Sequence, residues 1–493
     1  MAKYAMLILC LFTSCAAKKN ANSNHPNIYY AKDAVLKDVT VYDLDQYSFG
    51  SKEYVGNFSK DTSSVTFSVD VPVTDNYDII ISTAAAYGNG HKLNYVLVNG
   101  KQIGEIETVE NNKFDESVIR HVYLEKGKNE IAIKKNWGWI CVDYLNIRQS
   151  EDLSAFAYNT SPDLVNPDAS GSAKRLMKYI VDIYGKQTLS GQSGEGVNSG
   201  EFKAIHSAIG KYPAVMMLDM MDYSPTRVMY GTKPKAVEDA IEWHNMGGIV
   251  KFLWHWNAPK DLIDNEEHKW WSGFYTNATT FDLAKAMSKE DLDGYNLLLR
   301  DIDAIAEQLK RLSDLDIPVL WRPLHEASGG WFWWGASGSE SYKQLWILMY
   351  ERMTNHHGLN NLIWVWNGQH KDWFPGADHV DLVGEDIYAP KRDYGSQASK
   401  FYEIVEYLRE LGAMKPIGLT ECGIVPGINE MERDKAMWFM FATWNGDFVQ
   451  KRSGYRYTGE YSSEYTEIAH LRLIYNDKRI ITLNDLPGIK NNN

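Results

Sequence analysis

The order of apolar and polar positions divides the chain into an N-terminal part with a period of two and a longer part with mixed periodicity. Between residues 28 and 148, short stretches alternate apolar and polar side chains, as in 63–69, 77–81 and 130–133. The pair Asn99-Gly100 and the segment 126–129 separate such stretches. This alternation between turn residues is typical of antiparallel strands. We therefore predict a β-sandwich over residues 28–148.

The C-terminal part begins after residues 149–172, which are rich in Ser, Asp, Asn and Pro and are predicted to form a linker. From 173 to 490, amphipathic helical patterns such as 292–312 and 400–411 alternate with apolar runs. There are eight runs, at residues 188–191, 214–219, 248–253, 318–322, 362–366, 380–384, 416–420 and 440–444. This alternation favours a (β/α)8 TIM barrel over an open doubly wound sheet. No GxGxxG or Walker A sequence supports a nucleotide-binding fold.

The first residues predict export. Lys3 precedes an apolar run, 4–12, that is too short to span a bilayer. Phe12-Thr13-Ser14-Cys15 resembles a bacterial lipobox, in which the cysteine is lipidated and becomes the mature N-terminus. We predict a lipoprotein signal peptide over 1–15 and a tether over 16–27, with an ordinary cleaved signal peptide as the alternative. The expectation is an exported bacterial outer-membrane lipoprotein, periplasmic or surface-facing, that meets the membrane only through its lipid anchor.

Composition narrows the choice of partners. The chain has 17 Trp and 30 Tyr, which suits either stacking on sugars or aromatic-rich cores. Its net charge of −13 argues against nucleic acid and anionic membrane surfaces, because those partners require basic patches. Cys141 and Cys422 fall in different predicted domains, so no disulfide is expected. No Cys/His cluster has zinc spacing, and we expect neither a metal nor another cofactor.

Two glutamates follow predicted barrel strands. Glu326 comes after the fourth run and Glu421 after the seventh, so both are expected at the C-terminal face, where barrels carry their chemistry. A structural ion pair, for example with Arg322, is the alternative for either one. Two opposed carboxylates are what cleavage of a glycosidic bond requires, one protonated and one ionised. Five other charged residues lie in or beside strands: Lys251, Asp219, Asp222, Glu385 and Asp386. Any of them could touch substrate, and we interpret most of them as hydrogen-bond or salt-bridge partners near the cleft.

The segment 321–335, Trp-Arg-Pro-Leu-His-Glu-Ala-Ser-Gly-Gly-Trp-Phe-Trp-Trp-Gly, resembles the acid/base segment of glycoside hydrolase family 26, the β-mannanase family. Matching pieces begin at Leu189, Trp254, Gly384 and Thr420, and the resemblance covers roughly residues 173 to 485. It implies a mannan endo-1,4-β-mannosidase that hydrolyses mannan, galactomannan or glucomannan with retention, by double displacement. Alternatives are a β-1,3-xylanase or mixed-linkage β-glucanase of this family, or a non-catalytic polysaccharide-binding lipoprotein.

The resemblance also implies residue roles, with Glu326 as acid/base and Glu421 as nucleophile. It implies that His325 and Tyr388 hold and tune the carboxylates, and that Arg322 orients one of them. The implied substrate-binding residues are Trp331, His255, Trp256 and Trp444. Core packing is the expectation for Trp364 and Trp366, which lie within a predicted strand.

The N-terminal region resembles family 35 carbohydrate-binding modules over residues 86–92 and 136–144. The resemblance makes Tyr87, Trp137 and Trp139 sugar-binding candidates. Such modules begin with an Ala-Glu pair involved in calcium binding, whereas this chain has Ala31-Lys32. A spacer without ligand is the alternative for this domain.

Overall fold

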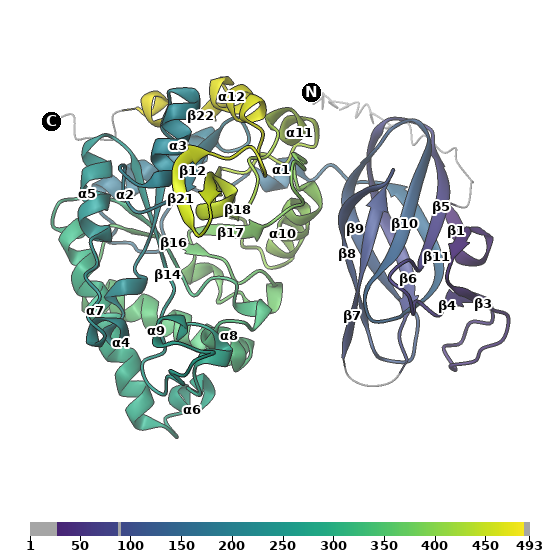
Figure 1. Cartoon of the computed structure of the whole chain (residues 1–493), viewed down its shortest axis with the longest axis horizontal. Coiled ribbons are helices and arrows are strands. Elements are labelled where there is room, and N and C mark those ends of the chain that lie inside the picture. The colour runs from purple at the N-terminus through teal and green to yellow at the C-terminus, as the bar shows by residue number, and fades with distance from the viewer. Residues whose placement is uncertain (1–26, 87–89, 488–493) are drawn as a thin grey trace, which may run out of the picture. The chain divides into compact units, whose positions relative to one another are not determined.

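The computed structural model describes residues 27–86 and 90–487, which form an N-terminal unit built mainly from residues up to 148 and a C-terminal unit from 149 onward (Figure 1). The predictions for the signal peptide, Cys15, the tether and Tyr87 lie outside the described residues. Within the described ranges, no helix has the length and apolar character needed to cross a membrane.

The N-terminal unit is all-β, as predicted, and consists of two sheets. One has the order β3-β4-β11-β6-β9, with β1 also paired to β11, and the other has the order β2-β5-β10-β7-β8. In β10 the burial alternates, so Ile131 and Ile133 enter the core. Asn99 and Gly100 both have positive φ, which suits the tight turn that joins β7 to β8. The strands are β1 Ile28–Tyr30, β2 Val35–Lys37, β3 Thr40–Tyr42, β4 Tyr54–Gly56, β5 Ser64–Val71, β6 Asp75–Ala84, β7 His91–Val98, β8 Lys101–Val109, β9 Asp115–Leu124, β10 Gly127–Trp137 and β11 Cys141–Gln149.

The C-terminal unit is an eight-stranded parallel barrel, which confirms the predicted fold. Each strand pairs with the next in sequence, and the first pairs with the last to close the barrel. The short strand β22, Ile480–Ile481, adds to the start of β12. The barrel strands are β12 Thr188–Ser193, β13 Val215–Asp219, β14 Ile249–Trp254, β15 Val319–Pro323, β16 Leu362–Trp366, β17 Leu382–Ile387, β18 Ile417–Cys422 and β19 Met440–Thr443.

Amphipathic helices surround the barrel. In α7, Asp291 caps the first turn by accepting the Gly294 N–H, and Leu298, Ile302 and Ile305 form part of its buried stripe. Between β16 and β17 the chain has only the short 3-10 turns η7, Lys371–Trp373, and η8, Ala377–His379. The α-helices are α1 Ser154–Ala157, α2 Gly171–Ile183, α3 Gly200–Ile209, α4 Pro225–Met229, α5 Ala236–Asn245, α6 Leu283–Met287, α7 Leu292–Ser313, α8 Trp333–Ala336, α9 Ser339–Glu351, α10 Ala398–Glu410, α11 Ile428–Arg433 and α12 Ile468–Asn476.

The segment predicted to be a linker, 149–172, packs instead as part of the barrel unit. Leu153 is buried in the core of this unit. The buried Asp381 carboxylate accepts the Val165 N–H at 2.7 Å and the Trp364 N–H at 2.8 Å, and burial raises the pKa of Asp381 to about 6. The Ser170 N–H donates to the Asn360 carbonyl at 2.7 Å. The polar composition of the segment therefore reflects specific hydrogen bonds to the barrel.

The core of the barrel unit holds much of the tryptophan. Trp364 and Trp366 are fully buried, as expected for residues within a strand. Trp333 and Trp334, from the Trp-rich segment after Glu326, are also buried. The two described cysteines, Cys141 and Cys422, are both free and buried, in agreement with the absence of a predicted disulfide.

Candidate active site

The two glutamates lie at the C-terminal ends of β15 and β18. The backbone that leads to Glu326 is strained, because Leu324 and Glu326 both have φ of 53° although neither is glycine. The Glu326 N–H donates to the backbone carbonyl of Asn367 at 2.7 Å, which helps to hold this conformation. A residue with a side chain in the left-handed region costs roughly 1–2 kcal/mol of conformational free energy. Holding Glu326 in this position therefore lowers the stability of the folded protein.

Three carboxylates meet at this end of the barrel. One oxygen from each of Glu326, Asp386 and Glu421 lies within 4.8 Å of the others. Asp386 and Glu421 are paired residues on the adjacent strands β17 and β18. Carboxyl groups about 5–5.5 Å apart match glycosidases that retain configuration, whereas inverting enzymes need roughly 6.5–9.5 Å. The spacing of Glu326 and Glu421 is compatible with a retaining glycosidase.

Arg322 forms ion pairs with two of these carboxylates. Its guanidinium is fully buried, donates from Nη1 to Asp386 at 2.7 Å, and donates from Nη2 to Glu421. The Thr420 hydroxyl donates to the other oxygen of Asp386 at 2.7 Å. Charge-assisted hydrogen bonds of this kind fix both the position and the ionisation of a carboxylate. The residue predicted to orient a glutamate therefore contacts Glu421 directly.

Tyr388 is the second donor to Glu421. Its hydroxyl donates to Oε2 at 2.8 Å, while the other carboxylate oxygen faces Arg322. The side chain of Glu421 is only 4% exposed, so water contributes little to its solvation. The two donors replace that water and stabilise the negative charge.

The carboxyl of Glu326 has a different environment. Burial and the nearby charge of Asp386 raise the pKa of Glu326 to about 7. The Trp331 indole N–H donates to Oε2 of Glu326 at 2.9 Å, which opposes part of that shift. The site thus contains two carboxylates that pair with an arginine, those of Asp386 and Glu421, and a third, that of Glu326, which binds a proton near neutral pH.

Residues 165–484 match the model described as Glycosyl hydrolase family 26. The chain belongs to this family. Residues 27–150 match the model of Carbohydrate binding module (family 35). The family 26 domain accordingly spans the whole barrel and begins inside the segment 149–172.

Several relatives match the chain over nearly its full length. A mannan endo-1,4-beta-mannosidase of Thermothelomyces thermophilus is 39% identical, and the match covers 99% of both proteins. Mannan endo-1,4-beta-mannosidase B of Piromyces sp is 35% identical over 100% of this chain and 82% of its own length. The crystal structure of the Podospora anserina GH26-CBM35 β-(1,4)-mannanase is 41% identical, with a TM-score of 0.64, and covers 94% of this chain and 99% of that one.

A histidine pair lies beside the carboxylates of the family 26 domain. Asp219 accepts from His255 Nδ1 at 2.6 Å, and His255 Nε2 lies 3.2 Å from His325 Nε2. Burial lowers the pKa of His325 well below its usual range, so this ring is neutral. The family resemblance implies that His325 helps to hold and tune the carboxylates. In the described residues its Nε2 faces His255 and its Nδ1 has no hydrogen-bond partner, so it does not act through a direct hydrogen bond to a carboxylate. His325 instead supports His255.

The tryptophans that were predicted to bind substrate differ in how deeply they are buried. Trp331 is 46% exposed, and Trp444 is half-buried at the end of β19 with its ring 5.9 Å from that of His255. Trp256 is fully buried, and its indole donates inward to Asp301 at 2.9 Å. Trp256, implied to bind substrate, therefore offers no exposed surface to a ligand, whereas the neighbouring His255 is partly exposed.

Two residues that lie in the site, Asp386 and Lys251, were not assigned to it from the sequence. Asp386 was interpreted as a generic strand-end partner, yet it belongs to the carboxylate cluster. Lys251 lies inside the barrel and donates to the carbonyl of Thr420 at 2.5 Å, next to Glu421. Burial and the charge of Arg322 lower the pKa of Lys251 well below its usual range. The only sequence signal was a polar residue within or just after an apolar strand.

The two described sugar-binding candidates of the N-terminal unit are exposed. Trp137 and Trp139 have exposed fractions of 60% and 46%, and the Lys92 ammonium lies 4.7 Å from the centre of the Trp137 ring. Lys32, at the position of the calcium-associated Glu of such modules, forms an ion pair with Glu53 at 2.7 Å. An ammonium at this position repels a cation.

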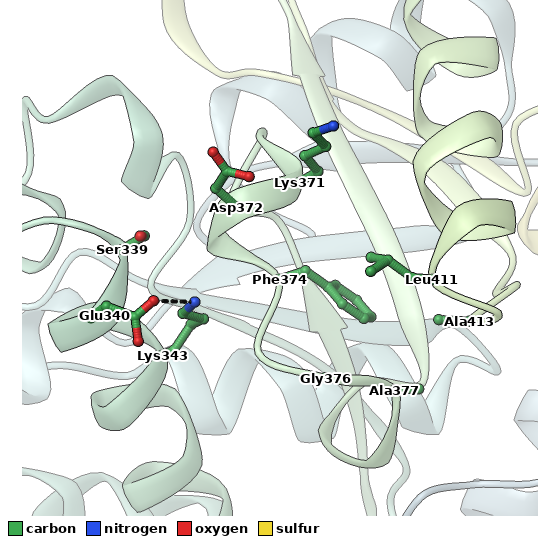
Figure 2. A pocket seen from close by; sticks show the side chains of 10 residues that line it. All are labelled: Ser339, Glu340, Lys343, Lys371, Asp372, Phe374, Gly376, Ala377, Leu411 and Ala413. Carbon is green, nitrogen blue, oxygen red and sulfur yellow. Dashed lines mark ion pairs between the residues drawn. The ribbon is translucent and has the colours of Figure 1, made fainter.

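A hollow on the flank of the barrel lies apart from these groups (Figure 2). The extended segment between β16 and β17 supplies Phe374, and Leu411 and Ala413 face it from beyond α10. An ion pair of 2.5 Å between Glu340 and Lys343 lies on the α9 side. Neither Glu326 nor Glu421 is among the residues that line it.

Proposed function

We propose that this family 26 member is a mannan endo-1,4-β-mannosidase that cleaves β-1,4-mannosidic bonds with retention of configuration. The observation that carries the proposal is the pair of carboxylates, close together but differently solvated, in a chain whose full-length relatives bear that name. Products released from mannan, galactomannan, glucomannan, xylan and lichenan, measured side by side, test it. Release of sugars from lichenan or xylan alone would leave the proposed retaining mechanism in place but would contradict mannan as the substrate.

The proposed mechanism assigns one step to each glutamate. Glu421, held ionised by Arg322 and Tyr388, attacks the anomeric carbon and forms a covalent glycosyl-enzyme. Glu326, which binds a proton near neutral pH, gives that proton to the leaving oxygen. In the second step Glu326 takes a proton from water, which attacks the anomeric carbon and restores Glu421. A protein that only binds polysaccharide would not need the strained backbone that positions Glu326. This strain therefore favours catalysis over the non-catalytic alternative.

The N-terminal unit is proposed to hold polysaccharide through Trp137 and Trp139. Exposed indole rings offer flat apolar faces to the C–H faces of sugars, and burying one on a ligand recovers hydrophobic free energy. In an affinity gel containing mannan, a full-length Glu421→Ala protein should be retarded without degrading the polymer. Adding Trp137→Ala should remove most of the retardation, whereas adding Val73→Ala, on an exposed loop, should not. No retardation on a broad panel of plant polysaccharides would support a spacer.

Export with a lipid on Cys15 is also proposed, from the apolar run and lipobox-like segment that precede the described residues. When the full gene is expressed in a bacterium that processes lipoproteins, the protein should incorporate an alkyne-labelled fatty acid and partition with membranes. Cys15→Ser should abolish both properties. If Cys15→Ser were still labelled, or if the wild-type protein were soluble and unlabelled, lipidation of Cys15 would be refuted. An ordinary cleaved signal peptide would then be the remaining interpretation.

The pH dependence should report Glu326. Because the acid must be protonated, kcat/KM should fall as the pH rises through about 7. Trp331→Phe removes a hydrogen bond that stabilises the ionised carboxylate, so the pKa should rise and the alkaline limb should move up by about one unit. The measurement is kcat/KM on a soluble substrate at a series of pH values. Trp271→Phe, which changes an exposed indole with no contact to Glu326, should leave the limb in place, and an acid shift in Trp331→Phe would contradict the assignment.

Azide should distinguish the two glutamates. Glu326→Ala should lose about 10²–10⁴-fold on mannan but keep much of its first step on an activated aryl mannoside, whose leaving group needs no proton. Azide should then accelerate turnover and give the β-linked product, because it enters from the face that water normally uses. Glu421→Ala should be nearly inactive on all substrates and give, with azide, the α-linked product.

The matched control is Glu340→Ala, which removes a glutamate from the flank of the barrel and should retain full activity. Interchanged behaviour of the two site variants would reverse the roles. Full activity in either one would remove that residue from the mechanism.

A further inference from the structure

A β-hairpin stands at the catalytic face of the barrel, directly after the eighth strand. Beyond β19 the chain forms the 3-10 turn η9, Gly446–Phe448, and then β20, Gln450–Ser453, and β21, Arg456–Tyr461. Figure 1 shows β21 in yellow close to α3. The tip contains Gly454 with φ of 63° and Tyr455, whose side chain is completely exposed.

The base of the hairpin is held firmly. Glu201, in the first turn of α3, accepts from Gln450 Nε2 at 2.6 Å and from the Gly446 N–H at 3.2 Å. Gly200 allows this approach, since a Cβ there would collide with the Gln450 side chain. The Ser462 N–H donates to the Val449 carbonyl at 2.8 Å and closes the segment. The side chains near the base are therefore preorganised.

A cavity of 460 Å³ opens beside this base, which is within the usual range of about 300–1,000 Å³ for small-molecule sites. Four charged side chains line it together with Ser462 and Tyr465: Asp447, Lys451, Arg452 and Glu464. Two acidic and two basic groups give a formal charge of zero. A balanced set of carboxylates, cations and hydroxyls suits a neutral ligand with many hydroxyl groups better than it suits an anion or a cation.

Arg452 is placed to bind such a ligand. Its guanidinium donates to Asp447 and, at 2.6 Å, to the hydroxyl of Tyr457, and it lies 4.7 Å from the centre of the Tyr457 ring. A guanidinium carries five N–H donors, so these contacts fix its plane and leave others for a partner. Its side chain is 48% exposed.

An aromatic path joins the cavity to the catalytic carboxylate. The Tyr465 ring lies 4.5 Å from that of Phe448, and Phe448 lies 5.3 Å from the ring of Tyr388. Tyr388 in turn donates to Glu421 at 2.8 Å. The lining of the cavity is therefore linked to Glu421 through the side chains of Tyr465, Phe448 and Tyr388.

We propose that this cavity binds a neutral pyranose unit of the substrate, either a further backbone unit or an α-galactosyl branch, while the bond at Glu421 is cut. The inference rests on the proposed function. It makes Arg452 a specificity-determining residue that acts on long or branched substrates and leaves the chemistry of short ones unaffected.

The test compares Arg452→Ala with Arg456→Ala, which removes the same charge from the same hairpin at a position that does not line the cavity. For each protein, kcat/KM is measured on unbranched mannan, on galactomannan and on a short activated aryl mannoside. Arg452→Ala should lose about tenfold on polysaccharide, the factor that corresponds to 1.4 kcal/mol. It should stay within about twofold of wild type on the aryl mannoside, and Arg456→Ala should match wild type throughout.

The pattern of loss identifies the bound unit. A loss confined to galactomannan assigns the cavity to the branch, and an equal loss on both polymers assigns it to the backbone. Unchanged polysaccharide turnover, an equal loss on the aryl mannoside, or the same loss in Arg456→Ala would overturn the inference. The wild-type protein tests the proposed function separately, since failure to cut any mannan refutes that function whatever the ratio between variants.

Discussion

The site depends on one buried guanidinium. Burying the carboxylates of Asp386 and Glu421 next to each other costs several kcal/mol per ion unless a counter-charge and hydrogen bonds compensate. Arg322 supplies both from β15, which β16 separates from β17, with one nitrogen to each carboxylate. Glu326 forms no ion pair with Arg322. Burial and the charge of Asp386 therefore raise the pKa of Glu326. A single arginine therefore gives two nearby glutamates opposite proton preferences.

The barrel makes this arrangement possible because parallel strands end together. Arg322, Asp386 and Glu421 come from β15, β17 and β18, and the last two are directly paired. Residues on these strands need little additional support, since neighbouring strands fix their backbone. Glu326 lies past the end of its strand, and Asn367 at the end of β16 fixes it through two hydrogen bonds to one N–H. The strained φ at Leu324 and Glu326 is the cost of that placement.

Aromatic residues serve two separate purposes in this chain. Trp256, Trp333 and Trp334 are buried behind the histidine pair, where each indole N–H finds an acceptor. Two of those acceptors are the backbone carbonyls of Trp256 and His325, so these hydrogen bonds hold the backbone next to the histidine pair. Trp137, in the family 35 region, and Trp331, in the family 26 region, are exposed. The aromatic excess in the composition thus reflects both buried core residues and exposed rings.

From the sequence alone, the eight barrel strands, the all-β N-terminal region, the family and the positions of both glutamates could be predicted, because periodicity and short motifs are local properties of the chain. Only the tertiary structure decided that residues 149–172 pack on the barrel through Asp381, that Trp256 is buried while His255 is partly exposed, and that Asp386 shares Arg322 with Glu421. These outcomes depend on distances between residues far apart in the chain. One residue of difference along a strand end reverses the side that a side chain faces, and no pattern of apolar positions records which carboxylates an arginine will reach.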